Sequence, residues 1–160
     1  MKIKNLLAYH ISSDKYDLGE YLKPKTRIFD SEPKSKSEEF IEEIRSNMYK
    51  DKPSRLTSIF VSPDMETAKR WRDKKRRFKP TIIYEVELSG YLSVHISEYY
   101  EECFSFFDNS PYKIKTECKT KEEAADKYWT EIVEFKANDE YLVEGIFVGE
   151  AKVVGIWDLK

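Results

Sequence analysis

The segment TSIFVSPDMETA, residues 57–68, contains the change from strand to helix on which the fold prediction depends. Residues 59–61 are apolar and aromatic, as is typical of a buried strand. We predict Ser62 as the helix N-cap and Pro63 at the first helical position, where its missing N–H costs nothing. The acidic residues that follow the proline interact favourably with the positive, N-terminal end of the helix dipole. The segment therefore predicts a strand that runs directly into a helix.

Further strands are predicted from apolar or alternating runs that end at glycine or at polar corners. They cover residues 6–11, 81–88, 91–94, 140–147 and 151–157. We expect Gly90 to turn the chain between the second and third of these strands. We expect Gly149 to join the last two as a hairpin.

Helices are predicted at three further places from their first residues. One begins at Ser37, one runs from Ser97 towards Phe107, and one begins at the capping box TKEE that opens with Thr120. Residues 12–36 contain two prolines and a glycine and predict a long irregular connection. Because strands and helices do not alternate strictly, the pattern favours an α+β fold with a mostly antiparallel sheet.

The composition fits one compact domain over residues 1–160. Lysine and arginine number 28 against 30 acids, for a net charge of -2, which excludes a polycation that coats nucleic acid. The two cysteines, Cys103 and Cys118, exclude a disulfide framework and a four-cysteine zinc site, and we expect small core thiols rather than nucleophiles. No apolar run is long enough for a signal peptide or a membrane span, so we expect a cytoplasmic protein without a membrane partner.

Charged residues cluster in two places that have more than one interpretation. Residues 69–79, KRWRDKKRRFK, hold eight basic residues in eleven and predict a site for phosphates or an acidic protein, or else a solvated helix end. Glu85 and Glu87 share one face of a predicted strand, either for acid–base chemistry or, more often, as its solvent face. His10 and His95 are the only histidines and lack metal-ligand spacing, so we expect no metal.

Three segments, in this order, resemble a known signature: YHIS at 9–12, IFVSPDMETA at 59–68 and NDEYLV at 138–143. They are similar to the His, Tyr and Glu motifs of the diphtheria-toxin-like branch of the ADP-ribosyltransferase superfamily, which includes the poly(ADP-ribose) polymerases. The first two also resemble rifampin ADP-ribosyltransferases. The middle one also resembles RNA 2′-phosphotransferases, which share the fold and consume NAD.

The resemblance implies an ADP-ribosyltransferase-like fold of split, mostly antiparallel sheets flanked by helices, with NAD as the substrate. It implies that Glu140, on a late strand, is the catalytic residue and grips the nicotinamide ribose. His10 would be the second catalytic residue and would hydrogen-bond the adenosine or the nicotinamide ribose of NAD. Ser12 with the Ile11 backbone would hold the carboxamide. Independently of the family, a fixed carboxylate stabilises the positive charge that the ribose develops as nicotinamide leaves.

The middle motif departs from the family at Phe60, which stands where a tyrosine stacks on the nicotinamide ring. Stacking survives this change, but the phenolic hydroxyl does not. Either Trp71, Tyr9 or Tyr84 compensates for its loss, or activity is reduced. Ser62 completes the NAD-binding set that the resemblance implies.

The predicted function is therefore a mono-ADP-ribosyltransferase with a macromolecular acceptor, a protein rather than RNA or DNA, near residues 69–79. The resemblance also suggests a toxin or a phage-encoded effector that modifies host machinery. Two alternatives stay open. One is an RNA 2′-phosphotransferase-like enzyme, and the other is a binding module that is eroded at Phe60 and uses residues 69–79. Without the motifs, His10 and Glu140 would be a strand-end histidine and a surface charge.

Overall fold

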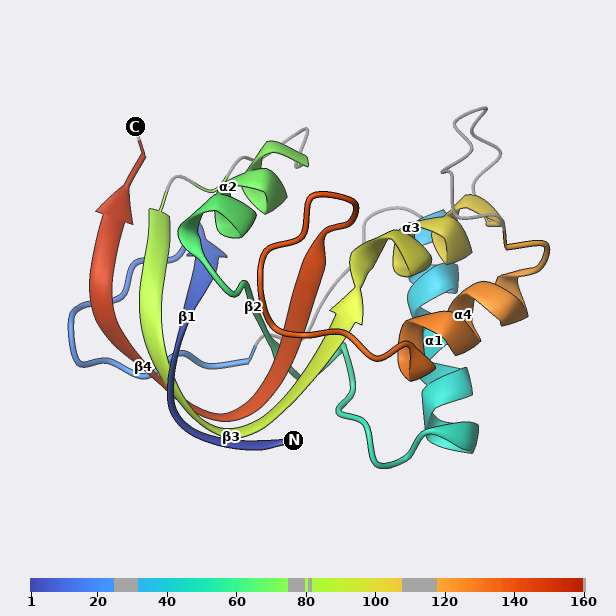
Figure 1. Cartoon of the computed structure of the whole chain (residues 1–160), viewed down its shortest axis with the longest axis horizontal. Helices are drawn as coiled ribbons and strands as arrows, with labels where there is room; N and C mark the ends of the chain where they lie inside the picture. The colour runs from blue at the N-terminus through green and yellow to red at the C-terminus, as the bar shows by residue number, and fades with distance from the viewer. Residues whose placement is uncertain (25–31, 75–79, 81, 108–117, 160) are drawn as a thin grey trace.

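The computed structural model describes residues 1–24, 32–74, 80, 82–107 and 118–159. Within them, four strands and four helices form an antiparallel sheet with helices packed against it (Figure 1). The order is β1 (Lys2–Ser12), α1 (Glu32–Met48), β2 (Ile59–Val61), α2 (Met65–Lys74), β3 (Ile82–Ile96), α3 (Ser97–Ser105), α4 (Lys121–Thr130) and β4 (Val143–Asp158). The predicted α+β class with an antiparallel sheet is confirmed. No helix in the described ranges is long and apolar enough to cross a membrane.

The sheet has the order β1-β3-β4-β2, so β1 and β2 are its two edge strands. These edges meet at one point, because the backbones of Tyr9 and Ser62 exchange hydrogen bonds of 2.9 and 2.7 Å. The outer edge of β4 is shared by two segments. Residues 145–147 pair with β2, and residues 151–153 bond the backbone of residues 19–22.

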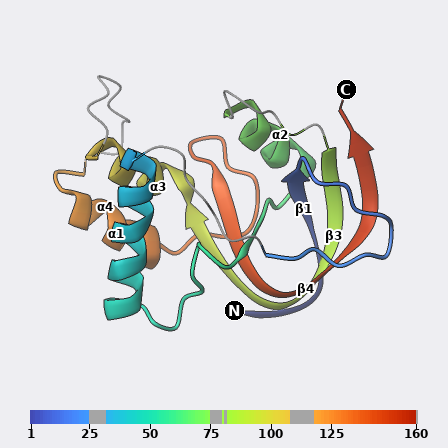
Figure 2. The same ribbon diagram turned by 180° about the vertical axis from the view of Figure 1, so that it is seen from behind.

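Gly90 and Gly149 lie opposite each other in the register of β3 and β4, two long strands that bend strongly together (Figures 1 and 2). A Cβ at either glycine would lie 2.8–2.9 Å from the Cα of the other, and Phe147 packs its ring over both. Only glycine permits this approach, which lets the two strands bend together. The predicted turn at Gly90 and hairpin at Gly149 are therefore wrong. Each strand passes through its glycine without reversing.

The start of α2 is set by Asp64 rather than by Ser62. The Asp64 carboxylate accepts a hydrogen bond of 2.7 Å from the backbone N–H of Thr67, which is the contact an N-cap makes. Ser62 instead continues the edge of β2 by pairing with Tyr9. The predicted strand-to-helix unit is confirmed, but its predicted cap is two residues too early.

Of the three other predicted helix starts, two are confirmed and one is wrong. The capping box of α4 is confirmed, because Thr120 Oγ1 accepts from the backbone N–H of Glu123 at 3.1 Å. The predicted start of α3 at Ser97 is also confirmed. The predicted cap at Ser37 is wrong, since α1 begins five residues earlier and buries Ser37 within the helix.

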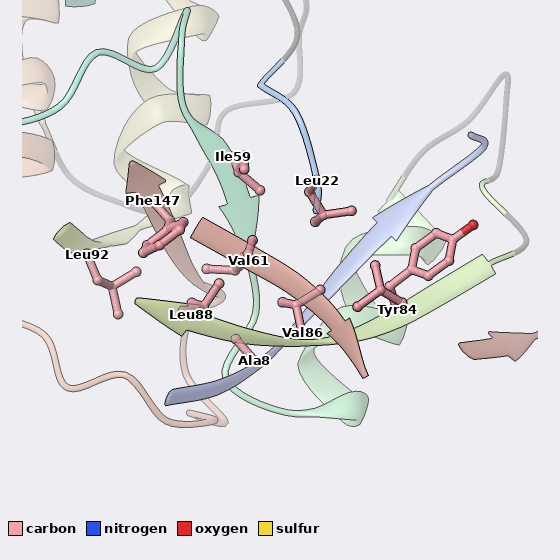
Figure 3. Packing of buried hydrophobic residues seen from close by; sticks show 11 residues of the cluster. Ala8, Leu22, Ile59, Val61, Tyr84, Val86, Leu88, Leu92 and Phe147 are labelled. Atoms are coloured by element: carbon pink, nitrogen blue, oxygen red, sulfur yellow. The ribbon is translucent and has the colours of Figure 1, made fainter. Parts of the chain in front are cut away.

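Two apolar clusters stabilise the fold, one on each face of the sheet. The first fills the concave side of the bent strands (Figure 3), and its buried members are Ala8, Leu22, Ile59, Val61, Tyr84, Val86, Leu88, Leu92, Phe147, Ala151 and Val153. The second joins the opposite face to α1, α3 and α4, and its buried members are Ile41, Cys103, Ala124, Ala125, Tyr128, Trp129 and Ile146. Helix α2 stands apart from these three helices, near the end of β1 (Figures 1 and 2).

Replacement of Gly149 by alanine is expected to lower the free energy of unfolding by about 3 kcal/mol, through backbone strain and crowding. Gly149 has a φ of 141°, and a Cβ there would lie 2.6 Å from the Ser89 carbonyl oxygen. Gly19→Ala is the control, because its φ is 88° but its Cβ would meet no atom within 4 Å. Its expected cost is only about 1 kcal/mol. Urea denaturation of both variants tests this, and equal losses would contradict it.

Candidate functional site

The first two predicted motifs meet where the edges of β1 and β2 touch. The Tyr9–Ser62 pairing holds the backbones together, and His10 adds a side-chain contact, since its Nδ1 lies 2.7 Å from the carbonyl oxygen of Phe60. A carbonyl oxygen only accepts, so Nδ1 donates, and this bond fixes the orientation of the imidazole ring. The structure thus brings His10, Phe60 and Ser62 together from segments fifty residues apart.

Ser12 ends β1 next to His10 and is held in place by its own turn. Its Oγ accepts a hydrogen bond of 3.0 Å from the backbone N–H of Asp14, and the residue is almost fully buried. Ile11, between them, is half-buried. His10 and Ser12 share the face of β1 that carries Ala8, the face of the concave core. Both side chains therefore point to the same side of the sheet.

Glu140 lies on a turn just before β4, not on a strand as predicted, because β4 begins only at Val143. The turn is pinned by Asn138, whose Oδ1 accepts from the backbone N–H groups of Glu140 and Tyr141 at 2.8 and 3.3 Å. The Glu140 residue itself is exposed. A hollow of about 200 Å³ lies beside it, lined by Ile132, Val133, Glu134, Lys136, Asn138 and Tyr141. The turn thus carries an exposed carboxylate on a fixed backbone, and its neighbours Asn138 and Tyr141 line the hollow.

Helices α2 and α3 hold this turn from both sides. Arg70 of α2 donates to the Asn138 carbonyl oxygen at 2.7 Å, and the Trp71 indole donates to that of Val143 at 3.3 Å. From α3, the Glu98 carboxylate accepts from the backbone N–H of Leu142 at 2.9 and 3.0 Å. Since α2 begins directly after the β2 motif, it connects the third motif to the other two.

The basic segment 69–79 is only partly described, because residues 75–79 lie outside the described ranges. Within it, Arg70 and Arg72 bond backbone carbonyl oxygens, Arg72 that of Pro80 at 2.9 Å. Lys74 lies 3.0 Å from Glu101 and 3.6 Å from Glu98. These basic side chains thus hold neighbouring parts of the fold, while Lys69 is exposed.

Two predicted NAD contacts, Phe60 and Tyr9, direct their side chains away from the face that carries His10. The Phe60 ring packs with the second apolar cluster, and the Arg55 guanidinium lies 4.9 Å from its centroid. The Tyr9 hydroxyl donates to Glu85 at 3.0 Å on the outer face of the sheet. Tyr84, on the core face, donates to the Asp14 carbonyl oxygen at 2.7 Å. Of the predicted compensating aromatics, only Trp71 contacts the segment that contains Glu140.

A buried charge cluster that the sequence did not indicate lies behind Phe60. Arg55 is 4% exposed and forms ion pairs with Glu38 of α1, at 3.1 Å, and with Glu144 of β4. Its Nη1 also donates to the Tyr128 hydroxyl at 2.6 Å, and its guanidinium lies 4.0 Å from the Tyr100 centroid. Burial alone would lower the pKa of Arg55, but Glu144, Tyr128 and Glu38 raise it well above its usual value. The arginine therefore stays charged in the interior.

His95 is enclosed next to this cluster and is neutral. Its Nδ1 donates to the Tyr128 carbonyl oxygen and its Nε2 accepts from the Ser93 hydroxyl, both at 2.7 Å, while its ring stacks on Tyr128. Burial is the main cause that lowers its pKa to about 3, and Arg55 adds to the effect. Cys103 is buried as predicted, and burial raises the pKa of its thiol to about 12. These values disfavour His95 as a proton carrier and Cys103 as a nucleophile near pH 7.

Removal of the Arg55 charge is expected to cost about 3–5 kcal/mol of stability in Arg55→Met, because two carboxylates are left buried without a counter-charge. Further neutralisation by Glu38→Gln and Glu144→Gln should recover much of this loss. Arg45→Met is the control, since Arg45 pairs with Glu42 near the surface and should cost about 1 kcal/mol or less. Urea denaturation measures all three. Equal costs for the two single arginine variants would contradict the prediction.

Mild acid is expected to destabilise the fold through His95. Its pKa is about 3 when folded against 6.5 for the free side chain, so only the unfolded chain takes up a proton between these values. Stability should therefore fall as the pH drops below about 6.5, by up to about 1.4 kcal/mol per unit. Denaturation at pH 7, 6 and 5 tests this, with His95→Gln expected to flatten the profile. A wild-type stability that is equal at pH 7 and 5 would contradict it.

Comparison with known proteins gives a family but no activity. A family described as "Protein of unknown function (DUF2441)" matches residues 2–158. No curated protein matches the sequence. The match runs from the start of β1 to the end of β4 and so includes all three motif segments and the buried Arg55 cluster. The chain therefore belongs to the DUF2441 family.

Proposed function

We propose that this chain is an NAD-dependent mono-ADP-ribosyltransferase whose acceptor is a macromolecule, a protein rather than a nucleic acid. The observation that supports the proposal is the assembly of the three motif segments. His10 bonds Phe60, Tyr9 pairs with Ser62, and α2 holds the turn of Glu140 through Arg70 and Trp71. Helix α2 thereby links segments that are spread over most of the chain, since His10 pairs with the start of β3 and Val143, which follows the Glu140 turn, pairs with the end of β3.

In the proposed reaction, the bond between the ribose C1′ and the nicotinamide nitrogen breaks, and its electron pair leaves with nicotinamide. The ribose then carries positive charge, which the Glu140 carboxylate stabilises. A nucleophilic atom of the acceptor bonds C1′ and loses a proton, which completes the transfer. Asn138 keeps the Glu140 backbone fixed, so that the carboxylate needs little reorganisation as the charge develops.

His10 and Ser12 bind and orient NAD in this proposal. The bond from His10 Nδ1 to the Phe60 carbonyl oxygen keeps the ring in one orientation towards a ribose hydroxyl. Ser12 and the Ile11 backbone offer polar groups for the nicotinamide carboxamide. The Phe60 ring packs into the second core, so Trp71 is the aromatic candidate for stacking on nicotinamide. The exposed Lys69 on α2 gives the acceptor a positively charged approach to the site.

Glu140→Gln is expected to reduce nicotinamide release and ADP-ribose transfer by at least about a hundredfold, as loss of a charge-stabilising group typically does. The control is Asp139→Asn, which removes a charge from the neighbouring residue and should keep activity within about twofold. Incubation with labelled NAD and a cell lysate measures both products.

A measurement of NAD binding distinguishes a variant that has lost the chemical step from one that no longer binds NAD. NAD at a hundred times its Kd should stabilise wild type and Glu140→Gln alike, by about 2.7 kcal/mol. Equal nicotinamide release by wild type and Glu140→Gln would contradict the proposed role of Glu140. Stabilisation by NAD without any release from wild type would instead indicate a binding module.

A further inference from the structure

We propose that the outer face of the sheet, at Tyr9, Glu85 and Trp157, binds an arginine side chain of a partner polypeptide. This surface, called the aromatic–acid face below, is on the opposite side of β1 from His10. Tyr9 and Glu85 are direct partners in the β1–β3 register, and Trp157 of β4 follows beside them. The proposal does not depend on NAD chemistry.

Trp157 forms the base of the aromatic–acid face. Its ring lies over Gly155, where an added Cβ would be 2.7 Å from the indole, so that glycine lets the ring lie close to the sheet. Trp157 is 41% exposed, so much of this large aromatic residue is open to solvent. The Tyr9 ring lies 6.3 Å away at 55° and forms a side wall. The two rings thus make an open corner rather than a closed stack.

Glu85 supplies the charge at this corner. It is opposite Gly155 in the register, and its Cβ lies 3.2 Å from the position of an added Gly155 Cβ. Because the Trp157 ring lies over the same glycine, the Glu85 side chain leaves the backbone beside the indole. The Tyr9 hydroxyl donates to Glu85 Oε2, which orients the carboxylate. Among the described residues, no lysine or arginine forms an ion pair with Glu85, whereas Glu87 on the same face has Lys152 opposite it.

Burial, Glu85 and then Asp64 raise the pKa of the Tyr9 hydroxyl, which agrees with a negative potential at the corner. A cation is therefore the complementary ligand, and an aromatic surface beside a carboxylate favours a guanidinium. Arginine can stack its plane on the indole while its N–H groups bond the carboxylate, whereas an ammonium makes a single compact contact. The ligand of this face is thus an arginine side chain on a protein partner.

The test uses nuclear magnetic resonance of the full chain with a capped peptide, Gly-Gly-Arg-Gly-Gly. Trp157→Phe assigns the Trp157 indole N–H signal among the three tryptophans. We expect that signal to shift and saturate with the arginine peptide, and to stay unchanged with the peptide in which neutral citrulline replaces arginine. The lysine peptide should bind more weakly than the arginine peptide, by about threefold or more. Equal shifts with all three peptides, or none with arginine, would overturn the proposal.

Two matched variants locate the charge. Glu85→Gln should weaken arginine binding by about fivefold or more, while Glu87→Gln, on the same face, should leave it within about twofold. The remaining amide signals of both variants should keep their wild-type positions, which shows that they fold. Equal effects of the two variants would overturn the assignment to Glu85. Concentration-dependent shifts without peptide would show that a second copy of the chain occupies the face, and would overturn the proposed partner.

Discussion

The packing of α1, α3 and α4 against the sheet depends on the charge balance around Arg55. Glu38 belongs to α1 and Glu144 to β4, and neither carboxylate could be buried without a cation between them. The same guanidinium lies over Tyr100 of α3 and bonds Tyr128 of α4. One side chain from an irregular segment therefore ties three helices to the sheet. Because Phe60 also packs under it, the cluster supports the strand whose carbonyl oxygen orients His10.

The second constraint is geometric, and it places the candidate site. Gly90 and Gly149 let β3 and β4 bend as a pair over the Phe147 ring. The bend brings the edge strands β1 and β2 close enough for Tyr9 and Ser62 to bond. In a flatter sheet these edges would lie two strands apart, since β3 and β4 separate them in the order. The meeting of the first two motifs is thus a consequence of curvature, and the third motif joins them through α2.

The sequence predicted the parts of this fold that local chemistry determines. The alternation of residues 81–88, the strand-to-helix unit of residues 57–68 and the Thr120 cap all depend on neighbours within a few residues. The prediction failed where a distant partner decides. Whether a glycine bends or reverses a strand depends on the strand opposite, and Ser37 lost its role as a cap because α1 extends before it. The Arg55 cluster has no local pattern, because its partners are 17, 73 and 89 residues away. For the candidate site, the motifs indicated His10 and Glu140, but not that the side chains of Tyr9 and Phe60 would leave the His10 face.

The position of β4 has a consequence for the order of folding. It follows the other three strands along the chain, yet it lies inside the sheet between β3 and β2. Until residues 143–158 are available, β2 has no strand beside it other than the single bridge to β1, and one edge of β3 stays open. Neither apolar cluster can close before that point, because both contain residues of β4. A growing chain therefore stays vulnerable to pairing with other chains until residues 143–158 have been synthesised. Once β4 is in place, β2 and residues 19–22 pair with parts of its outer edge.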